Sequence, residues 1–231
     1  MIKKVVFEVE TITPMFLAGA DQGKVELRVA SIKGLLRFWW RALQAESDIE
    51  KLRNRESQIF GSSDEKTGGG SSFAIRIIPN SDLKPTKNKF PTNSQYQISV
   101  EGKTFKINIL EYLAYGTEYI QRQGNVFTRE HYPAKTKFDI AVSFTDEAWE
   151  NEVLKTFYVW SIFGGIGSRS RNGFGSFDVL NKEKAFEDIK EVVSIKTPYI
   201  KGNIEKLVKK EKIDIRSRIL EYEQVMNKMR G

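Results

Sequence analysis

Residues 1–11, MIKKVVFEVET, decide the fold, because they carry the first regular apolar alternation of the chain. Val5, Phe7 and Val9 alternate with other side chains, a period of two that predicts a β-strand near residues 2–12 with one face in a core. The basic start leads into this alternation and not into a continuous apolar segment, so we interpret it as a strand and not as a secretory signal peptide.

Helix and strand patterns follow this strand in a regular order. Ser31 is a candidate N-cap for a helix over 32–46, and a charged helix near 48–60 stops at Gly61. The remaining expected elements are strands at 73–79, 137–144 and 174–180, a hairpin at 95–110 that turns at Glu101–Gly102, and a helix over 146–163 that is capped by Thr145 and ended by Gly164–Gly165.

The order strand, helix, strand, strand, helix, strand is that of a ferredoxin-like β-α-β-β-α-β unit. We therefore predict an α+β body over 1–181, in which about 61–134 is a long loop and hairpin insertion between the middle strands. Residues 182–231 are expected to form a helical C-terminal extension. Its apolar side chains at 4-3-4-3 spacing form one stripe, which packs either on the body or on a neighbouring subunit: Ile215, Ile219, Tyr222, Met226 and Met229.

The composition restricts the chemistry that this chain can perform. Its 231 residues include 37 Lys and Arg against 30 Asp and Glu, a net charge of +7 that favours nucleic acid first and a membrane surface second. The absence of cysteine excludes disulfides and thiol chemistry, and the single histidine excludes a site that needs two imidazoles. The apolar runs are too short to span a bilayer. We expect a cytoplasmic protein with no cofactor, no metal and no membrane partner.

The segment SIKGLLRFWWR (31–41) has two distinct faces on a helical wheel of about 100° per residue. The apolar face, continued to the end of the predicted helix, holds Ile32, Leu36, Trp39 and Leu43. The second face holds Lys33, Arg37 and Arg41, with Trp40 at its border. Cations for phosphates beside an aromatic plane for a base are what a single RNA strand requires.

Two further features strengthen this first constellation. Gly34, in the expected first turn, leaves backbone N–H groups accessible where the helix dipole favours an anion. Upstream Lys24 and Arg28 bring the cations of residues 24–41 to five, against Glu26 alone. The alternative interpretation is an amphipathic helix with a solvated basic face and two core tryptophans.

A second constellation, GGIGSRSRNGFGS (164–176), combines five glycines, two arginines and three serines. Glycine lets the backbone approach a ligand, and consecutive N–H groups in such a turn bind anions. Arg169 and Arg171 can clamp phosphates, whereas Phe174 alternates into the last strand and is interpreted as core. The segment lacks the lysine of a P-loop and leads into a strand, which excludes the common mononucleotide and dinucleotide motifs. A purely structural glycine turn stays open.

Three other groups of residues are candidates for function. His131 has no evident partner acid for general-base catalysis, so we interpret it as a surface or packing histidine. Asp21 is a single carboxylate, which is a poor metal site. The tyrosines of EYLAYGTEY are expected to form a packed aromatic cluster and not a stacking platform: Tyr112, Tyr115 and Tyr119.

These blocks resemble a known family. The glycine-rich loop between a last helix and a last strand resembles the signature of the RAMP superfamily. Four N-terminal blocks, in this order, are similar to the first-numbered RAMP subunits of the Cmr, or type III-B, CRISPR effectors: TPMFLAGADQ (13–22), ELR (26–28), SIKGLLRFWWRAL (31–43) and IFGS (59–62). The resemblance covers about 1–62 and about 111–180.

The resemblance implies an RRM-related, ferredoxin-like fold, binding to CRISPR RNA or its target, and docking against other RAMP subunits near the 3′ end of the guide. Such subunits are usually built from two ferredoxin-like units, so the second unit here would be reduced or merged with the first. The family blocks fall on Lys33, Arg37, Trp40, Arg41, Gly165, Gly167, Arg169, Arg171, Gly173 and Gly175. Family members often carry another basic residue where this chain has Asn172.

The sequence therefore predicts a non-catalytic RNA-binding subunit of a CRISPR ribonucleoprotein in antiviral defence, in contact with guide RNA, target RNA or both. The predicted RNA-binding residues are Lys24, Arg28, Lys33, Gly34, Arg37, Trp40, Arg41, Gly165, Gly167, Ser168, Arg169, Arg171 and Gly173. Two alternatives stay open. One is a metal-independent endoribonuclease that processes guide precursors, and the other is an assembly adaptor whose charge meets acidic neighbours.

Overall fold

A four-stranded antiparallel sheet organises the computed structural model, which describes residues 3–44, 46–64, 69–80, 83–88, 90, 96–117 and 126–186. The strand order across this sheet is β2-β7-β1-β8, and each neighbouring pair is antiparallel. Its strands are β1 (Lys3–Thr11), β2 (Phe73–Pro79), β7 (Lys137–Phe144) and β8 (Phe177–Val179). The predicted strands at 2–12, 73–79 and 137–144 are confirmed, as is a mixed α and β fold with an antiparallel sheet.

The period-two alternation of β1 places one face in the core, as the sequence predicted. Phe7 pairs with Ile140 in the β1–β7 register, and both are completely buried. Phe7 also stacks on Phe157, with ring centroids 3.8 Å apart. Charged Glu8, which follows Phe7 in the sequence, pairs with Asp139 on the other face of the sheet. The strand therefore separates a buried apolar face from a polar one.

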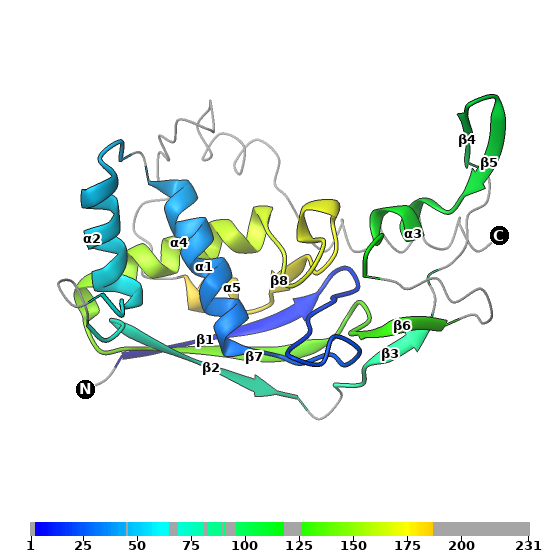
Figure 1. Cartoon of the computed structure of the whole chain (residues 1–231). Helices are drawn as coiled ribbons and strands as arrows, with labels where there is room; N and C mark the ends of the chain where they lie inside the picture. The colour runs from blue at the N-terminus through cyan, green and yellow to red at the C-terminus, as the bar shows by residue number, and fades with distance from the viewer. Residues whose placement is uncertain are drawn as a thin grey trace.

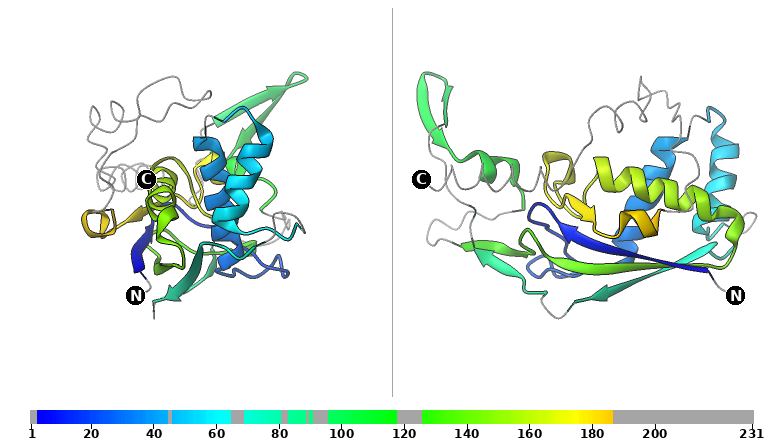
Figure 2. Two further views of the ribbon diagram at one scale, coloured as in Figure 1. Left: turned by 90° about the vertical axis from the view of Figure 1, so that its left-hand side faces the viewer. Right: turned by 180° about the vertical axis from the view of Figure 1, so that it is seen from behind.

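Three long helices cover one face of the sheet (Figure 1; Figure 2). They are α1 (Val29–Leu43), α2 (Ile49–Phe60) and α4 (Glu150–Phe163). A short helix, η1 (Glu147–Trp149), precedes α4, and another, α5 (Lys182–Ala185), follows β8. When the segments between β2 and β7 are set aside, the chain runs β-α-α-β-β-α-β, because α2 is added to the first crossover. The main core lies between these helices and the sheet.

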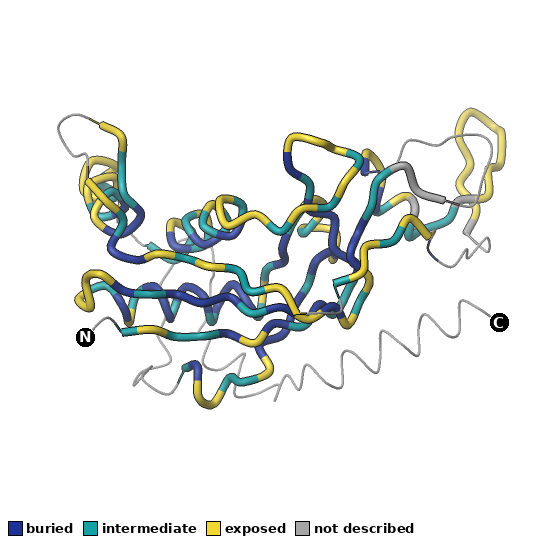
Figure 3. The backbone as a smooth tube through the Cα atoms, turned by 90° about the horizontal axis from the view of Figure 1, so that it is seen from below, coloured by how far each residue is buried: buried dark blue, intermediate teal, exposed yellow. Residues whose placement is uncertain are grey.

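The insertion between β2 and β7 forms smaller elements at one end of the body. They are β3 (Thr86–Asn88), β4 (Tyr96–Val100), β5 (Lys103–Ile107), α3 (Ile109–Leu113) and β6 (Val126–His131). The predicted hairpin is confirmed: β4 pairs with β5 around Glu101 and Gly102, which both adopt positive φ. This hairpin projects from the rest of the described chain, and its described side chains are exposed (Figure 3).

The helix boundaries differ from the sequence prediction at two N-termini. Helix α1 begins at Val29 with Arg28 at the N-cap position, so Ser31 lies inside the first turn and is not the cap. Asp146, and not Thr145, caps the helical segment that precedes α4. In contrast, α2 matches its prediction: Asp48 accepts two backbone N–H groups at its start, and Gly61 ends it with a φ of 79°.

The buried face of α1 is also rotated from the wheel prediction. Its fully buried residues are Ile32, Leu36 and Trp40, whereas Trp39 is only partly buried. Trp40 is 0% exposed because α1 packs against both α2 and α4. Its indole Nε1 donates to Glu152 Oε1 at 2.7 Å, so the ring faces the helix layer and not solvent.

The structure does not test the predicted C-terminal stripe, but it does bear on membrane spans. The tail stripe from Ile215 to Met229 lies outside the described residues. Within the described chain, none of the helices combines the length and apolar character needed to cross a bilayer.

Replacing Trp40 by Ala tests the corrected face of α1. We expect the unfolding free energy to fall by about 3–5 kcal/mol, because the substitution leaves a large cavity between three helices. Phe38→Ala is the matched control on the same helix. Its side chain is 49% exposed, so its loss should cost less than about 1 kcal/mol. Urea-induced unfolding measures both, and equal losses would contradict the assignment.

Candidate nucleic-acid interface

The glycine loop (164–176) is held by backbone hydrogen bonds to the segment that follows β1. Ser168 N–H donates to Phe16 O at 2.7 Å, and Gly175 N–H donates to Pro14 O at 2.8 Å. Between these two contacts the loop forms a short helix, η2 (Ser170–Asn172). Both ends of the loop are therefore fixed to the same segment, and its tip is presented to solvent.

The glycines of this loop pack against the protein's own backbone. A Cβ atom at Gly165 would lie 2.8 Å from Phe174 O, and one at Gly167 would lie 2.2 Å from Phe16 O. Gly167 also has a φ of +95°. Only glycine fits both positions, and the reason is packing within the fold. Packing within the fold thus accounts for Gly165 and Gly167, and their contact with RNA stays a prediction; Gly173, in contrast, is exposed with open space beside it.

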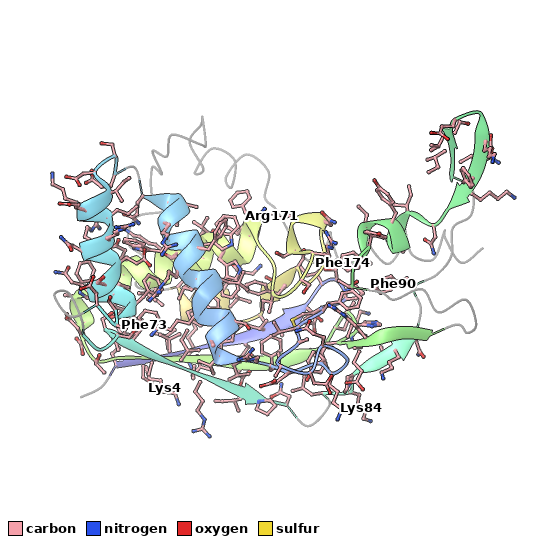
Figure 4. All side chains as sticks on the ribbon, in the orientation of Figure 1. Lys4, Phe73, Lys84, Phe90, Arg171 and Phe174 are labelled. Carbon is pink, nitrogen blue, oxygen red and sulfur yellow. The ribbon has the colours of Figure 1, made fainter. Side chains whose placement is uncertain are left out.

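A second aromatic cluster, separate from the main core, forms the base of the loop. Phe174 is buried and stacks on Phe90 with ring centroids 5.4 Å apart (Figure 4). Phe16 packs edge-on against both rings. The prediction that Phe174 belongs to the core is confirmed. Because apolar packing resists deformation, the cluster supports a rigid loop.

Arg169 and Arg171 project from the tip of this loop, and both are exposed. Arg169 adopts the left-handed conformation with a φ of 59°, and the Arg171 guanidinium lies 5.9 Å from the centroid of the Phe38 ring on α1. In the described part of the chain, neither guanidinium forms an ion pair. Both charges are therefore exposed to solvent, and their binding of phosphates stays a prediction.

The basic face of α1 has a different role from the predicted one. Arg41 forms a bidentate ion pair with Glu56 of α2, and this hydrogen bond raises the Arg41 pKa. Arg37 lies 3.3 Å from the same carboxylate and donates to Phe60 O and Gly61 O at 3.3 and 3.0 Å. Two arginines thus compensate one buried carboxylate, and Arg37 also caps the end of α2. The structure therefore gives both arginines a structural role that the sequence analysis did not predict, and their contact with RNA stays a prediction.

Three further predicted contacts on α1 also change. Lys33 is half-buried over the Phe73 ring, at 5.4 Å, and burial followed by the nearby Arg37 charge lowers its pKa. Trp40 is fully buried and cannot stack on a base. Gly34 is exposed, but α1 begins at Val29, so Gly34 lies in the second turn, where N–H groups bond within the helix.

The remaining predicted contacts are at the surface. Ser168 is exposed on the glycine loop. Lys24 and Arg28 are exposed on the segment before α1, each near one acidic side chain: Asp21 at 4.0 Å and Glu26 at 3.8 Å. Ion pairs this long at the surface are weak, so both cations stay available to a ligand.

His131 is buried in the second aromatic cluster and is 3% exposed. Its ring lies 5.0 Å from the Phe16 ring and 5.4 Å from the Phe90 ring, and burial lowers its pKa from 6.5 to about 4. A neutral imidazole in this position is a packing residue, as we interpreted it. Asp21 accepts the Gly23 N–H at 2.8 Å within its turn. Among the described residues, no three acidic or histidine side chains group as metal ligands.

The exposed aromatic residues near the loop were not predicted as surface residues. Tyr112 and Tyr115 are 67% and 71% exposed, which contradicts the predicted packed cluster, while Tyr119 lies outside the described residues. Phe38 is exposed next to Arg171. Its position on the wheel, opposite to Ile32 and Leu36, was the signal that could have identified it.

The uncovered face of the sheet offers no comparable platform. In the three longest strands, the side chains that alternate away from the helices are charged, small or aliphatic, and the exposed cations of this face are Lys4, Arg76 and Lys137. Phe73, Phe138 and Phe144 all point into the core. Bases cannot stack on this described face as they do on an RRM sheet.

Comparison with known proteins places the chain in a family. The RAMP superfamily model matches residues 8–178. The chain is 30% identical over 186 residues to the CRISPR system Cmr subunit Cmr1-2 of Pyrococcus furiosus, covering 75% of this chain and 94% of that protein. It is 28% identical over 192 residues to Cmr1-1 of the same organism, covering 79% of this chain and 50% of the relative.

The chain therefore belongs to the RAMP superfamily. Within it, the predicted resemblance to the first-numbered RAMP subunits of Cmr complexes is confirmed. The crystal structure of Cmr1 from Pyrococcus furiosus in its apo form shares the fold, with a TM-score of 0.56 and 24% identity over 80% of this chain. The chain spans nearly all of Cmr1-2 but about half of Cmr1-1 and 52% of the solved structure.

An Arg37→Ala substitution tests the structural role of the α1 cations. We expect the unfolding free energy to fall by about 1–2 kcal/mol, because two carbonyl groups and one buried carboxylate lose a charged donor. Arg53→Ala on α2 is the matched control: Arg53 is exposed and should change stability by less than about 0.5 kcal/mol. If Arg37→Ala unfolds at the wild-type urea concentration, Arg37 is not structural.

The buried His131 makes a prediction about pH. Because its folded pKa of about 4 lies below the ordinary 6.5, the unfolded chain binds the proton more readily between these values. Stability should therefore fall as the pH falls from about 6.5 to about 4, by on the order of 3 kcal/mol from this group. Unfolding free energies across this interval should decrease less steeply for His131→Phe; parallel curves would contradict the pKa shift.

Proposed function

We propose that this protein is a non-catalytic RNA-binding subunit of a type III-B CRISPR effector, which contacts guide RNA, target RNA or both and packs on other RAMP subunits in antiviral defence. One observation carries the proposal: Arg169 and Arg171 extend, without internal ion pairs among the described residues, from a loop that is fixed at both ends. Family membership and similarity to Cmr subunits support the type of complex.

The chemistry of the loop suits a single RNA strand. Guanidinium groups bind phosphate oxygens through two parallel hydrogen bonds, and the fixed loop reduces the entropy lost on binding. The exposed Phe38 ring beside Arg171 supplies a face for a base. A cation and an aromatic plane from two different elements thus meet at one place.

The proposed site is smaller than the sequence prediction. It keeps Lys24, Arg28, Ser168, Arg169, Arg171 and Gly173 and adds Phe38. The cations of α1 are left out, because Glu56 and the end of α2 already occupy Arg37 and Arg41. The proposed RNA path therefore follows the loop and meets α1 at Phe38.

The proposed absence of catalysis is supported by the position of His131. A general base must reach the 2′-hydroxyl of its substrate, and a histidine enclosed by Phe16 and Phe90 does not. The endoribonuclease alternative makes a different prediction: the purified chain would cut repeat RNA at a discrete position, and His131→Ala would abolish the cut.

The organisation of the body is part of the proposal. The strand order β8-β1-β7-β2, with α1 and α4 as crossovers, supports one ferredoxin-like unit within residues 1–181. We propose that residues 182–231 form a separate extension. The Cmr subunit names of the relatives support assembly with other RAMP subunits.

Removing both loop arginines tests the RNA interface. Arg169→Ala combined with Arg171→Ala should weaken binding of a single-stranded RNA about tenfold or more, because two phosphate contacts are lost. The slope of log affinity against log salt should become shallower by roughly 0.7 for each lost contact. Filter binding of the purified chain at several salt concentrations measures both quantities.

The matched control removes the same charge elsewhere. Arg53→Ala combined with Arg76→Ala deletes two exposed arginines on α2 and β2, away from the loop (Figure 1). This variant should retain most of the affinity. If the two double variants weaken binding equally, the effect is one of net charge, and the loop has no specific role.

A further inference from the structure

We propose that Tyr112 and Tyr115 form a base-stacking platform that extends the RNA path from the glycine loop onto the insertion. This inference rests on the proposed function, because it names additional residues for the same ligand. Both tyrosines are more exposed than any other aromatic side chain that the structure describes. Exposed rings of this size on a folded surface are typical of binding sites.

The platform is attached directly to the arginine-bearing loop. Asn172, between Arg171 and Gly173, donates its Nδ2–H to Leu113 O at 2.8 Å. Arg169 lies against Gly116: a Cβ atom at position 116 would be 2.6 Å from the Arg169 Nη2 atom. The residue that follows Tyr115 therefore touches the side chain of a proposed phosphate contact.

The opposite side of this segment is anchored in the second aromatic cluster. Ala114 is fully buried, and Leu110 and Leu113 pack against a group that includes Phe16 and Phe174. Asn108 caps α3 by accepting the Leu110 N–H at 3.1 Å. The backbone that carries the two tyrosines is thus fixed by packing, capping and the Asn172 hydrogen bond. A platform with a fixed backbone loses little entropy when a base stacks on it.

The arrangement favours nucleic-acid bases over a protein partner. Guanidinium groups stand at the loop tip, and an aromatic side chain flanks them on either side: Phe38 next to Arg171, and Tyr115 next to Gly116, where Arg169 lies. Alternating cations and aromatic rings match alternating phosphates and bases along one strand. An apolar protein surface would gain nothing from the neighbouring unpaired charges.

The test compares two probes with the purified full chain. A fluorescein-labelled oligouridine of about 20 nucleotides presents phosphates and bases, whereas an abasic oligonucleotide of equal length presents phosphates alone. Tyr112→Ala combined with Tyr115→Ala should weaken oligouridine binding about tenfold and leave abasic binding unchanged. The salt dependence should keep the wild-type slope, because no charge is removed.

Two control variants separate stacking from other effects. Tyr112→Phe combined with Tyr115→Phe keeps both rings and should bind oligouridine like the wild type. Ile49→Ala removes an equally exposed apolar side chain from α2 and should also have no effect. Thermal unfolding of the Ala variant should match the wild type, because both rings lie outside the core.

The outcomes distinguish this inference from the proposed function. Wild-type oligouridine affinity in the Tyr→Ala variant, together with weak binding by the Arg169→Ala and Arg171→Ala variant, would overturn the platform alone. Wild-type affinity in both variants would overturn the RNA interface as well. Equal weakening on oligouridine and on the abasic probe would exclude stacking and overturn the platform.

Discussion

The close approach of the glycine loop to the segment after β1 is the constraint on which the interface depends. Gly167 and Gly175 lie where any side chain would collide with the Phe16 and Ile166 carbonyl oxygens. Because these glycines allow the backbones to meet, Ser168 and Gly175 donate to Phe16 and Pro14. The contact joins the α4–β8 connection to the chain that leaves β1. It also fixes the direction in which the loop arginines project.

A second principle is the separation of charges into structural and free groups. Glu56 is buried between α1 and α2, and its carboxylate requires positive partners that it finds in Arg37 and Arg41. Those arginines stabilise the helix pair, and Arg37 also caps α2. Arg169 and Arg171 have no such carboxylate neighbour in the described chain, and their side chains are exposed. Arginines in different parts of the fold therefore differ in their interactions, because only Arg37 and Arg41 lie beside the buried Glu56 carboxylate.

The two aromatic clusters divide the molecule in a similar way. The main core, with Phe7, Phe157 and Trp160, holds the helices on the sheet. The smaller cluster around Phe16, Phe90 and Phe174 joins three segments: the chain after β1, the insertion and the glycine loop. It thus brings α3 and the turn after it, which carry the exposed Tyr112 and Tyr115, next to the glycine loop. The surface at this end combines residues that lie about sixty positions apart, such as Leu113 and Asn172.

The sequence by itself determined the strands, most helices and the two basic constellations, because local alternation, helix stop signals and glycine content act over short distances. It placed β1, β2, β7 and the β4–β5 hairpin correctly, and it singled out Arg169 and Arg171, which the structure shows to be exposed. It did not identify the structural roles of Arg37, Arg41 and Trp40, because a helical wheel describes one isolated helix and not the helices that pack beside it. The positions of Glu56 on α2 and Glu152 on α4 decided those roles, and both carboxylates lie on helices other than α1. Only tertiary packing brings such partners together, so only the folded structure separates residues that hold the protein together from those that face a ligand.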